Sequence, residues 1–214
     1  MNDASPPRRR TQAERLASTR RALVEAAIVE ITEVGYANAT GSLICQRAGL
    51  TRGALNHHFS DRVDLMVAVC EHAYAGYAAA MRAGVTTDMP LAERFDAVLR
   101  TAWAQMHDAQ NRALFELLIA ARHDPALSER LRPFVRRMDH HSLAEWLQLF
   151  SDLPVSRRLL EGVRDQYTSL LSGMSLMTQF DWDDRYLNYQ LKLFREMVVA
   201  RLETARRTGR QGSP

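Results

Sequence analysis

Residues 47–59 read RAGLTRGALNHHF, and this stretch decides how the N-terminal third of the chain folds. A helix-turn-helix needs a glycine in its turn, where the backbone takes a positive φ, and Gly49 stands at that place. It also needs a small residue where the two helices cross, and Cys45 can fill that position. The stretch therefore predicts two short crossed helices, over about 42–48 and 51–58.

The second of these helices has an outer face suited to the major groove of DNA. Thr51 can cap the helix, while Leu50 and Leu55 fill the core. The side chains left on the outside are short or basic, namely Arg52, Ala54, Asn56, His57 and His58. Glycine inside a helix costs about 1 kcal/mol, so Gly53 is explained if another backbone, such as that of DNA, comes close.

Helical spacing continues along the whole chain, and no run alternates apolar and polar residues as a strand would. The first helix should end at Gly35, in the left-handed C-cap conformation. Ser60 or Asp61 should cap a long helix that runs through Tyr77. Later helices are expected over about 91–108, 111–123, 126–151, 156–180 and 183–207. The chain is therefore predicted to be all-α, with about nine helices.

The composition is that of a globular protein of 214 residues, 46% hydrophobic and 25% charged. No apolar run approaches the ~20 residues needed to cross a bilayer, and no secretory signal is visible, so we expect a cytoplasmic protein without a membrane partner. Cys45 and Cys70 should be free thiols. The net charge is +3, and residues 8–62 alone carry nine arginines against five acidic side chains. This basic excess favours a polyanionic partner.

Residues 19–65 resemble the DNA-binding domain of tetracycline-repressor-like (TetR family) regulators. The matching positions are Gly35-Tyr36 at the end of the first helix, Thr40, Ile44-Cys45, Ala48–Leu55, His58-Phe59, and Arg62 before the apolar Leu65. The resemblance implies a helix-turn-helix domain followed by a helical effector-binding and dimerisation domain. The expected division is a disordered basic tail over 1–12, the DNA-binding domain over 13–62, the second domain over 63–207 and a disordered tail over 208–214.

The resemblance also implies roles at the DNA. Thr40 and Arg62 would bind phosphates of the DNA, and His58 would contact the DNA backbone. The residues that would face base edges are Arg52, Gly53, Ala54 and His57. Asn56 departs from the family, which usually has a phosphate-binding Tyr there; an asparagine can contact a base instead. Gly41 also departs, and its missing side chain should weaken one phosphate contact.

Regulators of this family generally repress transcription until a small molecule releases them from DNA. The resemblance therefore implies a homodimer on a palindromic double-stranded DNA operator and a small-molecule effector, of unknown identity, bound among the middle helices. The alternative is an effector-less architectural or oligomerisation protein, and a pocket of a few hundred Å³ would favour the regulator. No paired carboxylates and no Ser-His or Cys-His motif are visible, so neither an enzyme nor a cofactor is expected.

The last two helices are the expected dimer interface, paired with their mates in a four-helix bundle. Apolar residues repeat there at helical spacing, and a glycine would let a neighbouring backbone approach closely. The candidate interface residues are Leu159, Val163, Leu170, Gly173, Leu187, Leu191, Phe194 and Val198. The alternative is that these faces form the core of a single chain.

The middle of the chain is rich in aromatic and sulfur side chains, among them Phe134, Trp146 and Phe180, of which we expect half or fewer to contact a ligand. The candidate effector-binding residues are Trp103, Met106, His107, Phe115, Leu118, Arg122, Met138, His141, Met174 and Met177. Arg122 could anchor a carboxylate or phosphate. The favoured alternative for Arg122 is a bond to Asp124 or to the end of its own helix.

Other chemistry is disfavoured for the same residues. His57 and His58 are adjacent and diverge by about 100° on a helix, so they do not form a metal pair, and no metal site is predicted. The GLTRG run lacks the strand, the spacing and the lysine of a phosphate-binding loop. His140-His141 is interpreted as a solvated polar face with one histidine turned inward, and not as a pair of metal ligands. The arginines at 8–10 could enter a minor groove or form a nonspecific tail, and both possibilities stay open.

Overall fold

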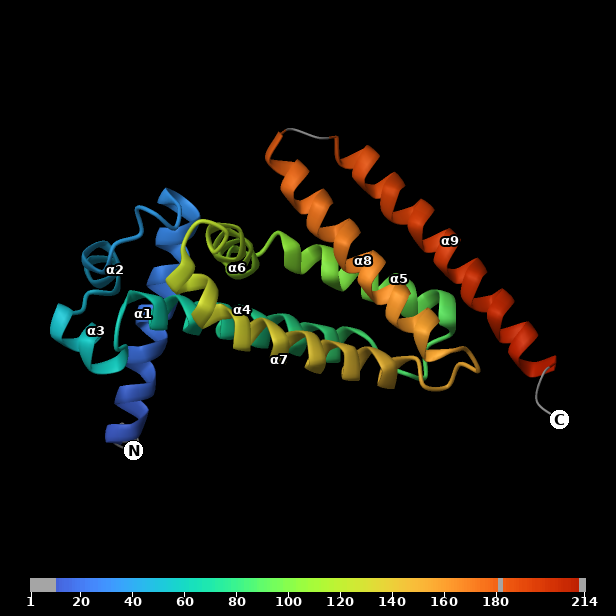
Figure 1. The fold of residues 1–214 in the computed structure, drawn as a ribbon, viewed down its shortest axis with the longest axis horizontal. Helices are drawn as coiled ribbons and strands as arrows, with labels where there is room; N and C mark the ends of the chain where they lie inside the picture. Colours follow the sequence, from blue (N-terminus) through green and yellow to red (C-terminus); the bar gives the residue numbers. More distant parts are fainter. Residues whose placement is uncertain (1–10, 181–182, 212–214) are drawn as a thin grey trace, which may run out of the picture. The chain divides into compact units, whose positions relative to one another are not determined.

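The computed structural model describes residues 11–180 and 183–211, and these residues form helices and connecting turns without any strand. This confirms the predicted all-α class. The helices (Figure 1) are Gln12–Val34 (α1), Gly41–Ala48 (α2), Arg52–His58 (α3), Arg62–Gly84 (α4), Leu91–Met106 (α5), Ala109–Ala120 (α6), Pro125–Leu149 (α7), Arg157–Met177 (α8), the 3₁₀ helix Thr178–Phe180 (η1) and Asp184–Gln211 (α9).

The first and the last described helices each extend further than expected from the sequence. Thr11 accepts from the backbone of Glu14, whose carboxylate accepts from Thr11 in return, so this capping box starts α1 at Gln12. At the other end, α9 continues to Gln211 instead of stopping at about residue 207. The arginines at 8–10 lie outside the described residues.

The chain divides into two compact units. The first unit comprises the residues up to His72 together with Ala113–Arg130, and the second comprises Ala73–Arg112 together with the residues from Leu131 onward. The boundaries between the two units fall inside the continuous helices α4, α6 and α7. The boundary expected from the sequence, after residue 62, lies instead at the start of α4.

The first unit contains the predicted helix-turn-helix, in which α1 packs on α2 and α3. Gly49 has φ 65° and ψ 30°, and the amide of Leu50 donates to the Cys45 carbonyl oxygen at 2.9 Å. The turn is therefore the predicted left-handed one, and Cys45 is buried at the crossing with Ile44. Gly35 differs from the expectation: its φ of 79° is positive, but its ψ of 158° places it in an extended region that is essentially restricted to glycine.

The second unit is built around a cluster of aromatic rings. The ring of Phe95 in α5 lies 6.3 Å from that of Trp146 in α7 and 6.5 Å from that of Phe150, the residue directly after α7, between ring centres. Helices α8 and α9 both pack against α5. None of the described helices is long and apolar enough to cross a membrane.

Candidate nucleic-acid interface and ligand cavity

Helix α3 is held at both ends and along one side. The Thr51 hydroxyl accepts from the amide of Ala54 at 3.1 Å, and the amide of Phe59 donates to the Leu55 carbonyl oxygen at 2.9 Å. The side chains of Leu55 and Phe59 are buried. The opposite side of α3 is therefore fixed in place as a solvent-facing surface.

We define the recognition surface as the outer face of α3. Its members are Arg52, Gly53, Asn56 and His57, all exposed, and Ala54, which is half-buried. His58 lies to one side of this surface: its ring meets that of His57 edge-on, 5.3 Å between ring centres, and it is half-buried. Burial, more than the nearby His57 and Arg20, lowers the pKa of His58.

Arg52 is oriented by a residue that the sequence analysis did not single out. Its Nη1 donates to the Ser42 hydroxyl in α2 at 2.8 Å, so the guanidinium is held toward the start of α2. Ser42 belongs to the same short helix as Cys45, and only the fold brings it next to Arg52. No pattern in the sequence predicts this contact.

The two glycines near this surface are explained by different structural reasons. A Cβ at Gly41 would lie 3.1 Å from Leu55 Cδ2, so the absence of a side chain lets α2 approach α3 closely. A Cβ at Gly53 would meet only Thr51 Oγ1, at an ordinary 3.6 Å. The fold itself therefore does not require glycine at position 53, which agrees with the predicted approach of another molecule.

A hollow of about 380 Å³ lies among α2, α3 and the start of α4. It brings together four of the eight predicted DNA-binding residues, namely Thr40, Arg52, Asn56 and Arg62. Thr40 also caps α2, because its hydroxyl oxygen accepts from the amide of Leu43 at 3.3 Å, which leaves the hydroxyl proton for another acceptor.

Arg62 is occupied within the fold. Its guanidinium donates to the carbonyl oxygens of Tyr36 and Ala39 and lies 4.1 Å from the centre of the Tyr36 ring. The expectation that Arg62 holds a phosphate did not anticipate these bonds. Asp61, one of the two expected caps, accepts from the amide of Asp64 at 2.7 Å and so begins α4.

Among the residues that the structure describes, no group of three or more histidine, cysteine or acidic side chains is arranged to hold a metal ion. Both cysteines are free and buried.

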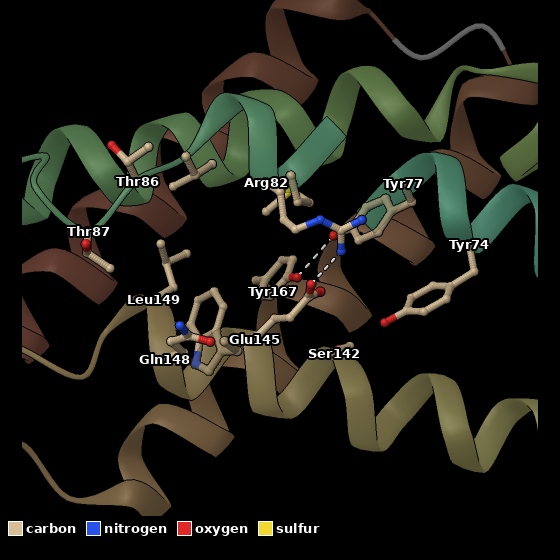
Figure 2. Close-up of a pocket in the computed structure, with 13 residues that line it drawn as sticks. Tyr74, Tyr77, Arg82, Thr86, Thr87, Ser142, Glu145, Gln148, Leu149 and Tyr167 are labelled. Atoms are coloured by element: carbon tan, nitrogen blue, oxygen red, sulfur yellow. Dashed lines mark hydrogen bonds and ion pairs between the residues drawn. The ribbon is translucent and has the colours of Figure 1, made fainter. Parts of the chain in front are cut away.

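The second unit contains a cavity of about 360 Å³. Figure 2 shows it between α4, the turn that follows α4, α7 and one residue of α8. The lining residues are Tyr74, Tyr77, Met81, Arg82, Val85, Thr86, Thr87, Ser142, Glu145, Trp146, Gln148, Leu149 and Tyr167.

Two polar pairs interrupt the aromatic wall of this cavity (Figure 2). Arg82 Nη1 lies 2.7 Å from Glu145 Oε1, and the hydroxyls of Tyr77 and Tyr167 are 3.2 Å apart. Burial is the largest cause that raises the pKa of both phenols, that of Tyr77 well above its usual value. Both phenols are therefore neutral hydrogen-bonding groups at physiological pH.

The turn that bears Thr86 and Thr87 is anchored by a buried arginine. Arg94 in α5 is 2% exposed and donates to the carbonyl oxygens of Thr87 and Met89. It also pairs with Asp152, with Nη1 2.5 Å from Oδ1, and that bond is the largest cause that lowers the pKa of the Asp152 carboxyl. Arg94 therefore fixes one wall of the cavity without lining it.

None of the ten candidate effector-binding residues lines this cavity. Arg122 is exposed and belongs to the first unit. His141 contacts a lining residue, because its Nδ1 lies 3.0 Å from the hydroxyl of Tyr74. Trp146, one of the other large side chains noted in the sequence, does line it. The sequence analysis treats Tyr74 and Tyr77 as part of an ordinary apolar helix face. Two tyrosines three residues apart, shortly before the end of a helix, were a signal that could have indicated the cavity.

Three of the eight candidate dimer residues are buried within their own chain. Val163, Leu187 and Val198 are buried, whereas Leu159, Leu170, Leu191 and Phe194 are half-buried and Gly173 is exposed. A second apolar face of α9 is open instead. This α9 outer face consists of Tyr186, Tyr189, Leu193 and Met197. Leu176, near the end of α8, and Phe180, in η1, are also exposed.

Comparisons with known proteins agree with this geometry. The profile of the family described as "Bacterial regulatory proteins, tetR family" matches residues 23–69, which contain the whole helix-turn-helix. The chain is 29% identical over 194 residues to the HTH-type transcriptional regulator CymR of Pseudomonas putida, an alignment that covers 89% of this chain and 96% of that protein.

A second relative and one solved structure extend the comparison. An uncharacterized HTH-type transcriptional regulator of Mycobacterium tuberculosis is 35% identical over 126 residues, or 58% of this chain and 63% of that protein. The fold is similar to the crystal structure of the multidrug binding protein EbrR complexed with imidazole, with a TM-score of 0.62 and 23% identity. That similarity covers 86% of this chain and 89% of the other.

Proposed function

The chain belongs to the TetR family of DNA-binding transcriptional regulators, and from this premise we propose that it is a homodimeric repressor that a small-molecule effector releases from a palindromic operator. The observation that carries the proposal is the recognition surface, which presents Arg52, Asn56 and His57 to solvent over the buried Leu55. A short helix with polar and basic tips on one face can enter the major groove and donate to base edges.

Sequence-specific binding is tested by selecting genomic DNA fragments with the full-length protein and measuring affinity for the selected operator and for scrambled duplexes. Arg52→Ala or His57→Ala should reduce the preference for the operator, by about tenfold or more for a lost bidentate base contact. Arg21→Ala is a matched control, because Arg21 is exposed on α1 and pairs with Glu25 at 3.5 Å. Unchanged discrimination in both α3 variants would remove the recognition surface from the proposal.

The dimer is proposed because one helix-turn-helix reads a single half-site, whereas a palindrome presents two. The exposed Leu176, Phe180 and the α9 outer face supply apolar surface for a second copy of the chain. We therefore assign the contacts between protomers to these exposed residues, and not to the residues of the same helices that are buried within the chain.

The effector is proposed to bind in the cavity of the second unit. Its volume, about 360 Å³, lies in the range of ligand sites, roughly 300–1,000 Å³. Helix α4 begins at Arg62, beside the helix-turn-helix, and carries Tyr74, Tyr77 and Arg82 in its later turns. A ligand that shifts these later turns acts on the helix that also begins in the DNA-binding unit.

The effector-less alternative predicts that no compound changes operator affinity. Replacing Thr87 in the cavity wall with Trp should fill the cavity and leave a repressor that stays on the operator. Under the alternative, this variant and the wild type would respond identically to every compound that binds.

A further inference from the structure

The cavity of the second unit has the chemical character of a site for one class of ligand. Its walls combine four aromatic side chains, one pair of neutral hydroxyls and one internally compensated ion pair. We propose that its ligand is a neutral one- or two-ring aromatic molecule with a small hydrogen-bonding substituent, such as a phenolic hydroxyl. The role of this ligand as the effector rests on the proposed function; its chemical class does not.

The aromatic wall favours a flat ring. Trp146 and Tyr167 stack, with ring centres 5.1 Å apart and planes 24° from parallel. Tyr74 and Tyr77 add two more rings from α4. Aromatic rings gain energy in stacked and edge-on contacts beyond the area that they bury. A cavity of about 360 Å³ has room for one or two such rings.

The two hydroxyls supply a place for one polar substituent. Tyr77 and Tyr167 are 3.2 Å apart at their oxygens, so one of them donates to the other. Whichever donates, one hydroxyl proton and at least two lone pairs are left over. A ligand hydroxyl can use both, as acceptor and as donor. A hydrocarbon of the same shape covers these groups and leaves them unpaired, which costs binding energy.

The charged side chains of the cavity select against a charged ligand. Arg82 and Glu145 cancel each other at 2.7 Å, and the second oxygen of Glu145 lies 3.5 Å from His141 Nδ1. An anion at Arg82 would compete with Glu145, and a cation at Glu145 would compete with Arg82. Each case leaves one side chain without its partner. Since both side chains are partly solvent-exposed, the discrimination should be about tenfold.

The test uses two matched series and the full-length wild-type protein. The 2-naphthyl and 4-propylphenyl groups each carry a hydroxyl, a hydrogen, a carboxylate or a trimethylammonium group. Dissociation constants from isothermal titration calorimetry are measured without DNA. In at least one series, the hydroxyl compound should bind about tenfold more tightly than the hydrocarbon and than either ion.

Two sets of variants assign the discrimination to residues. Tyr77→Phe/Tyr167→Phe should reduce the preference for hydroxyl over hydrogen to about twofold or less. Tyr74→Phe removes the same atom from a phenol already bonded to His141 and Met138, and it should keep the preference. Arg82→Gln/Glu145→Gln should lose most of the roughly tenfold discrimination against the two ions. Circular dichroism melts without ligand identify any variant whose fold is lost, and single substitutions then replace it.

The outcomes are distinct. Tightest binding of a carboxylate, lost in Arg82→Gln, would make this an anion site and overturn the proposal. Tightest binding of an ammonium compound, or no binding in either series, would overturn it as well. Operator affinity is measured separately. If the hydroxyl compounds bind but do not release DNA, the ligand class stands and the effector role fails. If operator binding is normal and no aromatic compound binds, only this inference fails.

Discussion

The guanidinium of Arg62 lies 4.1 Å from the centre of the Tyr36 ring and donates a hydrogen bond to the Tyr36 carbonyl oxygen. One arginine thus ties the start of α4 to the segment that joins α1 and α2. In the folded chain, the side chain expected at a DNA phosphate already has carbonyl partners. Two roles therefore compete for this residue, and they predict different measurements.

We expect Arg62→Met to act mainly on stability. The loss of hydrogen bonds from a charged donor should lower the free energy of unfolding of the first unit by about 1.5–3 kcal/mol. The slope of log affinity for DNA against log salt should change by less than about half a unit, whereas a lost phosphate contact would reduce it by about 0.9. Chemical denaturation and fluorescence anisotropy at several salt concentrations measure the two effects. A full change of slope with unaltered stability would restore the phosphate role.

Tyr36 makes a second bond in the same unit, which predicts a pH dependence. Its hydroxyl donates to Asp124 Oδ2 at 2.6 Å. This bond is the largest cause that lowers the pKa of the Asp124 carboxyl from its ordinary 3.8. Burial, and then the same bond, raise the pKa of Tyr36 from 10.0 to about 12. The stabilisation is therefore complete between about pH 4 and pH 10, and it is lost below that window and as the pH rises through about 12.

Tyr36→Phe should lower the stability of the first unit at neutral pH by about 1.5–3 kcal/mol and flatten both limbs of its pH profile. Hydrogen exchange of the α1 amides is the measurement, because the residues of the first unit contain no tryptophan and fluorescence reports on the second. Asp124→Asn should flatten the acid limb while it keeps a capping oxygen for the amide of Leu127. Unaltered acid and alkaline limbs in Tyr36→Phe would contradict this account.

Arg94 gives a third prediction, on the cavity wall. Arg94→Met frees the carbonyl oxygens of Thr87 and Met89 from a buried donor and leaves Asp152 unpaired. The second unit should lose about 2–4 kcal/mol of stability, measured by the midpoint of urea unfolding with tryptophan fluorescence. Arg100→Met is the matched control, since Arg100 is an exposed arginine of the same helix that pairs with Asp96. Equal losses in the two variants would show that the buried contacts of Arg94 do not anchor the turn.

The sequence predicted the helix-turn-helix because its determinants are local. Gly49 must have a positive φ, and Thr40 and Thr51 cap helices within three residues of themselves. The bonds of Arg62 were missed because their acceptors lie 23 and 26 residues away and are backbone atoms, which have no residue signature. The cavity was missed for a similar reason: its wall joins Tyr77 to Tyr167, 90 residues apart.

Helix α9 shows a different limit on what can be predicted from the spacing of apolar residues. Leu187, Leu191, Phe194 and Val198 repeat at helical spacing, and the structure turns this face toward its own chain. Phe194, for example, lies 6.1 Å from Phe95 between ring centres. The outer face repeats at helical spacing too. A periodic pattern identifies an apolar face but does not say whether it packs within the chain or against a second copy.

The two faces of α9 give the last prediction, on the oligomeric state. Met197 is 59% exposed and Leu187 is 2% exposed, so one substitution on each face separates association from folding. Met197→Glu places a charge on the proposed interface, where it would be buried without a partner. Analytical ultracentrifugation should then show a monomer at concentrations where the wild type is a dimer, with the melting temperature of the isolated chain nearly unchanged. Leu187→Ala should instead lower the free energy of unfolding by about 2–5 kcal/mol.

Gly173→Trp tests the same interface from α8. Gly173 is exposed and a Cβ there would meet no atom within 4 Å, so we expect the larger side chain to obstruct a second copy of the chain and to spare the fold. This variant should also be monomeric, and its operator affinity should fall steeply, because the two halves of a palindrome must then be bound independently. A dimer that survives both Met197→Glu and Gly173→Trp would place the contact between protomers away from α8 and the α9 outer face.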